Sequence, residues 1–133
     1  MRGRALAIFA VALLSVGAGT ASANPLTGKW LIVSVAGVGP VGSSRAMLEV
    51  RPDGALSASI GCNRLFGKST AKGSVIRIGP LGATRMACPQ PAMRREQALS
   101  QALGNVARVR TQGNMARLQS ASGVDLVTLA RAR

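Results

Sequence analysis

Short apolar segments alternate with polar residues along most of the chain, and glycine-containing turns separate them. Between residues 46 and 60, apolar side chains occupy every second position on both sides of a Pro52-Asp53-Gly54 turn. Proline fixes φ in such a turn and glycine accepts positive φ, so the two segments are expected to form a hairpin. The same rhythm continues toward the C-terminus and is typical of an all-β domain.

Eight segments are predicted to form strands, most of them joined by short turns. An antiparallel meander of this length that curls into a barrel or a strongly bent sheet removes most of its exposed edges. The predicted strands cover residues 29–36, 46–50, 56–60, 66–71, 74–78, 106–111, 115–120 and 124–130.

Residues 91–103 interrupt this pattern and predict a single helix. Pro91 lies in the first turn, Gly104 follows the end, and the segment contains few β-branched residues. Leu99 is expected to share one core with Trp30, Leu56 and Ile60. The predicted fold class is therefore mainly β (α+β), a single antiparallel barrel-like domain of about eight strands with one helix.

The first 23 residues differ from the rest and have the order of a secretory signal peptide. Basic residues precede an apolar run over residues 5–16, and Ala21-Ser22-Ala23 closes the segment. A membrane anchor is the alternative, but this run is shorter than the roughly 20 residues that span a bilayer. We predict cleavage after Ala23, no lipid anchor because no Cys follows the apolar run, no transmembrane segment, and a periplasmic or secreted domain over residues 24–133.

Composition narrows the classes of function. The chain has 17 Lys and Arg against 4 Asp and Glu, and no His. Histidine is the commonest general base and metal ligand, and the chain also has few carboxylates. We therefore expect no catalytic residue, no metal site and no cofactor. Nucleic acid is excluded as a partner, since beyond the leader the aromatic residues are only Trp30 and Phe66, too few for a stacking surface.

Two strings resemble enzyme motifs but lack the required context. Residues 37–42 match a dinucleotide-binding fingerprint, yet no helix follows and Pro40 stands where a backbone N–H should face phosphate. Residues 69–72 match a serine acyl-enzyme motif but lie in a predicted strand. The protein is therefore expected not to be an enzyme.

The basic residues of the C-terminal strands share a spacing. Residues 24–133 retain 15 basic residues and a formal charge of +11. Arg108 and Arg110 have the same strand parity, Arg117 alternates with Leu118, and Arg131 and Arg133 end the chain. If these five cations share an outer face, they would attract anionic lipids or polymers of the envelope. The alternative, a solvated basic surface, is favoured at this point.

The two cysteines are expected to pair. In an oxidising compartment Cys62 and Cys88 would close a loop of 26 residues, which could contribute roughly 3 to 4 kcal/mol of stability. Two buried free thiols or a redox switch are the alternatives.

The residues around these cysteines resemble a known family. The sequence is similar to the META domain, which includes the heat-shock HslJ-type envelope proteins of bacteria. The resemblance rests on Leu26-Thr27-Gly28-Lys29-Trp30-Leu31, Gly61-Cys62-Asn63-Arg64, Gly67, Gly79-Pro80-Leu81, Thr84-Arg85-Met86-Ala87-Cys88-Pro89, Glu96 and Leu99.

The resemblance implies an antiparallel barrel-like domain with one helix and little chemistry. Members are exported or lipid-anchored proteins linked to stress and antibiotic tolerance, without an established catalytic activity. This sequence lacks the lipidated Cys that many relatives carry after the signal. It also lacks the aromatic residues that relatives often have near Ser69 and Val109.

Each motif residue has a structural and a functional interpretation. Gly61 and Gly67 are expected to permit bends, and Asn63 to bond local backbone. Arg64 and Arg85 are the candidates for binding carboxylate or phosphate, with Arg85 pairing with Glu96 as the alternative. Thr84 and Met86 complete the motif as possible interaction residues.

The leading function hypothesis is a non-enzymatic envelope protein, a stress or antibiotic-tolerance accessory that binds a partner. The alternatives are an apolar-ligand carrier that uses the barrel interior, and a small inhibitor or enzyme that uses Arg64 and Arg85. A barrel of this size normally fills its interior with side chains, which disfavours the carrier. The protein is expected to be a monomer, and its partner an unidentified envelope protein or anionic envelope surface.

Overall fold

Ten strands and one helix make up the part of the chain that the structure, a computed structural model, describes: residues 3, 7–8, 10–12, 23–43 and 45–133. Most of the predicted signal peptide, including Ala21 and Ser22 of the cleavage motif, lies outside the described residues. The elements of the described residues fall within residues 28–131. In chain order they are β1 (Gly28–Val35), β2 (Gly39–Pro40), β3 (Met47–Val50), β4 (Ala55–Ser59), β5 (Arg64–Lys72), β6 (Val75–Ile78), β7 (Gly82–Ala83), α1 (Gln90–Gly104), β8 (Arg108–Gln112), β9 (Met115–Gln119) and β10 (Asp125–Arg131).

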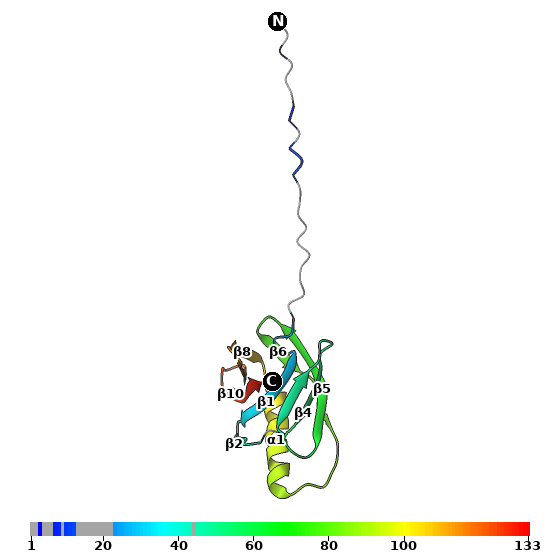
Figure 1. Cartoon of the computed structure of the whole chain (residues 1–133), viewed down its shortest axis with the longest axis vertical. Coiled ribbons are helices and arrows are strands. Elements are labelled where there is room, and N and C mark those ends of the chain that lie inside the picture. The colour runs from blue at the N-terminus through cyan, green and yellow to red at the C-terminus, as the bar shows by residue number, and fades with distance from the viewer. Residues whose placement is uncertain (1–2, 4–6, 9, 13–22, 44) are drawn as a thin grey trace.

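The sheet is antiparallel and has a ring-like arrangement. Its order is β10-β9-β8-β6-β5-β4-β3-β1, and β10 also pairs with β1, where Trp30 lies opposite Arg131. The contact between β6 and β8 is short, with Val75 opposite Arg108. The eight strands of the ring correspond to the eight predicted strands, so the predicted fold class is confirmed. In Figure 1 the ring surrounds a common centre and α1 lies at its lower end.

The turn between β3 and β4 has the geometry that its sequence predicts. Gly54 has φ of +90°, and its N–H donates to the Arg51 carbonyl at 2.8 Å. The Asp53 carboxylate accepts a hydrogen bond from the Ala55 N–H at 2.9 Å. This side chain therefore caps the turn and sets the register that sends Leu48 and Leu56 to the same face.

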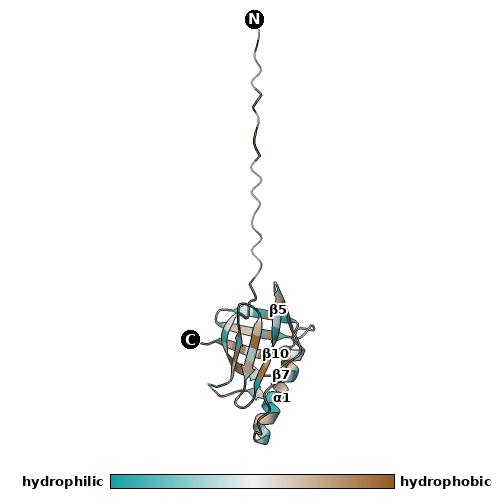
Figure 2. Ribbon diagram, turned by 90° about the vertical axis from the view of Figure 1, so that its right-hand side faces the viewer, coloured by the Kyte–Doolittle hydropathy of each residue, from teal (hydrophilic) through white to brown (hydrophobic). Residues whose placement is uncertain are grey.

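Alternation within the strands fills the interior of the ring. Leu48 and Val50 of β3 are buried, as are Ala116 and Leu118 of β9. The ribbon in Figure 2 alternates in the same way between hydrophobic and hydrophilic residues. The period of two thus converts each strand into one apolar inner face and one polar outer face.

The predicted core is confirmed. Trp30, Leu56, Ile60 and Leu99 are all at most 3% exposed and belong to one buried cluster. Leu99 lies on α1, which contacts β1 and β10. The helix extends one residue beyond the predicted 91–103 at each end.

Two short strands lie outside the prediction. β7 pairs with the start of β5, with Leu65 opposite Ala83, and β5 accordingly begins at Arg64 rather than at residue 66. β2 pairs with the end of β1. Both are two-residue segments in Gly-rich loops, where an alternating pattern has no room to appear.

Candidate functional site

Asn63 is the centre of a hydrogen-bonded cluster between the β4–β5 loop and the segment that precedes α1. Its side chain is 2% exposed. The amide oxygen accepts hydrogen bonds from the Met86 N–H at 2.7 Å and the Thr84 hydroxyl at 3.0 Å. The amide nitrogen donates to the Glu96 Oε2 at 3.1 Å and to the Met86 carbonyl at 3.4 Å. Asn63 therefore joins two segments that are more than 20 residues apart, rather than only its local backbone as predicted.

Glu96 completes this cluster from the helix. Its second carboxylate oxygen accepts a hydrogen bond from the Asn63 backbone N–H at 2.9 Å. Both Glu96 carboxylate oxygens thus accept hydrogen bonds from Asn63. The ion pairs among the described residues join Arg51 to Asp53 and Arg117 to Asp125, and neither includes Glu96. The alternative in which Arg85 pairs with Glu96 is wrong, because Asn63 takes the carboxylate and Arg85 is exposed.

The disulfide lies beside Asn63. Cys62 and Cys88 are bonded, with their Cα atoms 6.3 Å apart, as the sequence predicted. Gly61 precedes the bridge with φ of +119°, the bend expected of it. Gly67 instead lies in β5, where an added Cβ would be 2.7 Å from the Leu81 side chain. Its role is therefore close packing rather than a bend.

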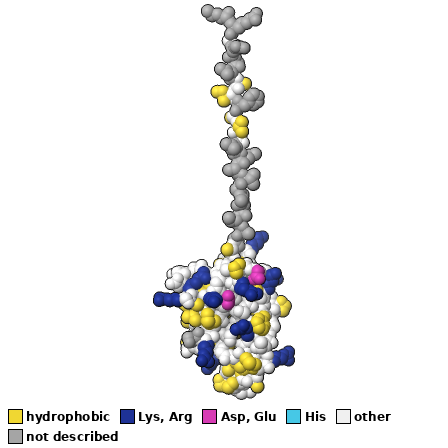
Figure 3. All heavy atoms as spheres, turned by 45° about the vertical axis from the view of Figure 1, so that its right-hand side comes forward, with side chains coloured by type: hydrophobic (Ala, Val, Ile, Leu, Met, Phe, Trp, Pro, Cys, Tyr) yellow, Lys and Arg dark blue, Asp and Glu magenta, His cyan; other side chains and the backbone are white. Residues whose placement is uncertain are grey.

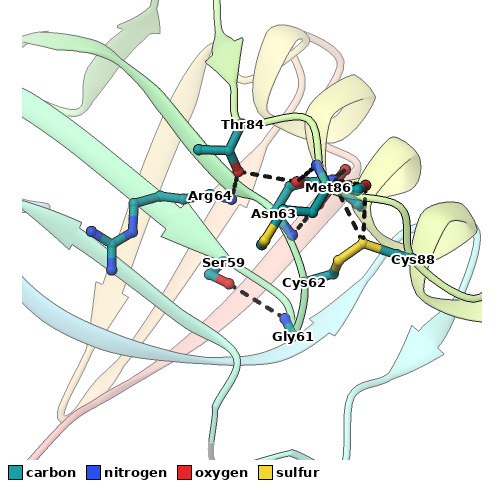
Figure 4. Close-up of a disulfide and its surroundings, with 9 residues drawn as sticks. Ser59, Gly61, Cys62, Asn63, Arg64, Thr84, Met86 and Cys88 are labelled. Carbon is teal, nitrogen blue, oxygen red and sulfur yellow. Dashed lines mark hydrogen bonds between the residues drawn. A yellow bond between two sulfur atoms is a disulfide. The ribbon is translucent and has the colours of Figure 1, made fainter.

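The Arg64 side chain does not join this cluster. Its backbone N–H donates to the Thr84 hydroxyl at 3.0 Å. In Figure 4 the guanidinium extends away from the disulfide, whereas Asn63 and Thr84 point toward one another. Arg64 therefore lies outside the Asn63 cluster, and Arg64 and Arg85 are both exposed. Arg64 faces outward from β5, and Met86 is 55% exposed.

Three of the five C-terminal arginines share the outer face of β8 and β9. Arg108, Arg110 and Arg117 are exposed, and Arg110 lies directly opposite Arg117 in the register. A depression of about 510 Å³ lies between these strands, with Arg110, Arg117 and Gln119 among its lining residues. Arg117 is 3.6 Å from the Asp125 carboxylate, the nearest counter-charge. We call Arg108, Arg110 and Arg117 the basic face.

Arg131 does not belong to the basic face, contrary to the five-cation prediction. It has the same strand parity as the buried Val127 and Leu129, and so turns toward the end of the ring. Its guanidinium lies 4.1 Å from the centre of the Trp30 ring and donates to the Thr27 carbonyl at 3.0 Å. This arginine therefore covers the core. Arg133 lies at the exposed C-terminal end.

A family model matches the chain from Asn24 to Arg133, the model of the META domain. The chain belongs to the META domain family. In this META domain, residues 61–63 and 84–89 of the family motif therefore form the Asn63 cluster and the disulfide.

Solved structures share the fold of this META domain. An NMR structure of a protein from Burkholderia xenovorans is 27% identical, has a TM-score of 0.65, and the match covers 80% of this chain and 83% of that one. A second NMR structure is 24% identical with a TM-score of 0.61, covering 79% and 89%. A crystal structure of a DUF4847 family protein from Bacteroides vulgatus is 14% identical with a TM-score of 0.57, covering 80% and 94%. The search of curated proteins finds no match.

Clusters of metal-ligating side chains and membrane-spanning helices are absent from the part of the chain that the structure describes. Across the described residues, no three His, Cys, Asp or Glu side chains are placed to share a metal ion. No helix in the same set has the length and apolar character needed to cross a membrane.

Sequence reasoning missed one contact of the motif and one exposed aromatic residue. The link from Glu96 to Asn63 has no local signature, because it joins residues 33 positions apart. Phe66 is 44% exposed on the outer face of β5, next to Arg64 in the same alternation. Strand alternation was the available signal for Arg64 and Phe66, since Leu65 between them is apolar and buried.

Proposed function

We propose that this META-domain protein is exported, is not an enzyme, and acts by binding an anionic partner of the cell envelope through its basic face. In the cell it would serve as a stress or antibiotic-tolerance accessory, as the family resemblance implies. The alternatives are an interior ligand carrier and an inhibitor or enzyme centred on Arg64 and Arg85.

The observation that carries the proposal is the juxtaposition of Arg110 and Arg117. Like charges directly opposite each other on neighbouring strands are destabilising, and here they border an open depression. Asp125 offsets only one of them, and Arg108 adds a third charge on the same outer face. A phosphate or carboxylate group placed between Arg110 and Arg117 would relieve the repulsion and receive forked hydrogen bonds. Figure 3 shows basic side chains spread over the visible face of the molecule, with few acidic ones among them.

The interior gives the carrier hypothesis little support. Trp30, Leu48, Leu118 and Leu129 are at most 1% exposed and occupy the middle of the ring. A ligand inside would have to displace side chains from this cluster.

The contacts of the motif give the loop hypothesis little support. Thr84 and Glu96 both hydrogen-bond to Asn63, and the Arg64 side chain extends away from the disulfide. A paired and buried amide cluster of this kind supports a structural role for the motif.

Two features support export. Asn24, which directly follows the predicted cleavage site, is held by the domain: its side-chain amide donates to the Ser69 hydroxyl at 3.0 Å, and its backbone carbonyl accepts from the Thr27 N–H at 2.9 Å. The disulfide is compatible with an oxidising compartment.

Sedimentation with vesicles tests the proposal. Protein of residues 24–133 should bind anionic vesicles and not neutral ones, and the binding should fall as salt shortens the Debye length from about 10 Å at 0.1 M. Each basic group near a charged surface contributes about 1 kcal/mol. Changing Arg108, Arg110 and Arg117 to Gln should therefore weaken binding by about 100-fold.

A matched control carries Arg45→Gln, Arg94→Gln and Arg95→Gln, which remove the same charge from exposed positions elsewhere. The control should lose much less affinity than the basic-face variant. Equal losses in the two variants, or equal binding to neutral vesicles, would contradict the proposal.

A further inference from the structure

A second surface, on the outer side of β3, β4 and β5, has the features of a ligand groove. Two adjacent depressions of about 380 and 210 Å³ lie along β4, and Glu49, Ser57 and Arg64 line both. The larger lies within the range of roughly 300–1,000 Å³ that small-molecule sites occupy. We call this surface the β4 groove.

The register explains the shape of the groove. Ser57 of β4 lies between Glu49 of β3 and Phe66 of β5 in one row, and Ser59 lies opposite Arg64 in the next. Serine side chains are short, so they form a low floor between longer side chains on either strand. The backbones of the two flanking strands are about 10 Å apart, two strand spacings of about 4.8 Å.

The side chains along the groove are of three chemical kinds. Phe66 exposes 44% of its surface, whereas Trp30, the other aromatic of the domain, is buried. Arg64 and Glu49 are each without an ion-pair partner within 4.0 Å among the described residues. The Ser57 hydroxyl takes part in no hydrogen bond within the same part of the chain and is free to donate or accept.

A sugar chain matches this combination. The C–H face of a pyranose packs on an exposed aromatic ring, while its hydroxyls bond to carboxylate and serine oxygens. Lys29, Arg51, Arg64 and Glu49 are the charged residues that line the two depressions. Arg51 is ion-paired with Asp53, so Lys29 and Arg64 remain against the single carboxylate of Glu49. The excess positive charge favours a sugar that carries a carboxylate.

We propose that the β4 groove binds an acidic oligosaccharide in which uronate and N-acetylhexosamine units alternate. Arg64 receives the uronate carboxylate as a forked donor. Phe66 carries the C–H face of that unit. Glu49 accepts hydrogen bonds from the hydroxyl and amide N–H groups of the neighbouring neutral unit, so its negative charge faces a sugar that bears none. A chain charged on every unit would meet Glu49 with like charge, which disfavours a simple polyanion.

This groove is separate from the basic face. In the ring, β4 is three strand contacts away from β8, and the depressions of the two surfaces share no lining residue. The two surfaces can therefore be tested independently.

Calorimetric titration of the oxidised protein of residues 24–133 tests the proposal at about 0.15 M salt, where surface attraction beyond about 8 Å is screened. The probe is a hyaluronan-type tetrasaccharide, with a neutral N-acetylhexosamine tetrasaccharide and hexaglutamate as controls. The acidic tetrasaccharide should bind at least 10-fold more tightly than either control.

Two variants and their controls locate the site. Phe66→Thr and Arg64→Gln should each weaken tetrasaccharide binding by at least 10-fold. Val75→Thr and Arg77→Gln make the same kinds of change on the outer face of β6, at positions that are likewise exposed, and should leave the affinity within 2-fold. The basic-face variant of the previous section should also bind the tetrasaccharide normally.

Each alternative outcome overturns the proposal. Tighter binding of hexaglutamate would mean that charge alone is recognised, and equal binding of the neutral sugar would mean that Arg64 reads no carboxylate. No measurable binding, or losses equal in the groove and control variants, would show that the groove is not a saccharide site. None of these outcomes bears on vesicle binding by the basic face.

Discussion

Replacing Asn63 by alanine tests whether the motif around the disulfide holds the fold together. The change deletes five side-chain hydrogen bonds, two accepted from Thr84 and Met86 and three donated to Glu96, the Met86 carbonyl and the Cys88 sulfur. A neutral hydrogen bond contributes about 0.5–1.5 kcal/mol net, and one to a charged group about 1.5–3 kcal/mol. Allowing for the weak 3.4 Å contact and for partial replacement by water, we expect a loss of about 3–5 kcal/mol in the free energy of unfolding.

This loss is large for a small domain, because total stabilities are about 5–15 kcal/mol. Asn63→Asp should be at least as damaging, since it removes both amide donors and places a second carboxylate against Glu96. Asn114→Ala, an exposed asparagine in the β8–β9 turn, is the control and should cost far less. The assay is urea unfolding of oxidised protein, followed by the emission of Trp30, the single tryptophan of the chain. A loss under 1 kcal/mol for Asn63→Ala would refute the claim that this cluster is structural.

Three further changes test the core, the bridge and the β3–β4 turn. Leu99→Ala should cost about 2–5 kcal/mol in unfolding free energy because Leu99 is fully buried. The control, Gln97→Ala at an exposed position of the same helix, should cost little. Similar losses for both variants would show that the buried face of the helix has been assigned wrongly. Changing both Cys62 and Cys88 to Ala should lower the free energy of unfolding by roughly 3–4 kcal/mol relative to the oxidised wild type, from the loss of loop closure alone. An unchanged urea midpoint would show that the disulfide does not form in solution. Gly54→Ala should destabilise the protein by about 1–3 kcal/mol, since φ is +90° and the new Cβ would lie 2.6 Å from the Ser69 carbonyl oxygen. The control is Gly42→Ala, because Gly42 has open space around it. Equal urea midpoints for the two variants would contradict this account of the turn.

The strands could be predicted because their signals are local. A Pro-Asp-Gly turn and a period of two are written within about ten residues, and they fix which residues face inward before any partner strand is known. Closure of the ring was less accessible. It depends on β1 and β10 meeting from opposite ends of the chain, which accumulated strand twist brings about and no local pattern encodes.

The candidate site was harder to predict than the fold. Asn63 looked like a turn residue, and only the folded chain brings Glu96 and Met86 to it. Arg131 looked like a surface charge, but it shares the parity of the buried Val127 and Leu129, and this parity turns it toward Trp30. Arg64 could have been placed from its parity with Phe66, but its position two residues after Cys62 suggested a place beside the disulfide instead.

Mapping of backbone amide shifts on addition of anionic bicelles tests the central claim most directly, because one spectrum reports every part of the molecule. The account predicts that shift changes concentrate on the outer residues of β8 and β9, around Arg108, Arg110 and Arg117, and fade as salt rises. It also predicts that Trp30 and Leu129 in the core and Asn63 in the motif cluster remain unperturbed. Changes centred on the interior of the ring, or on Asn63 and Arg85, would contradict binding through the basic face.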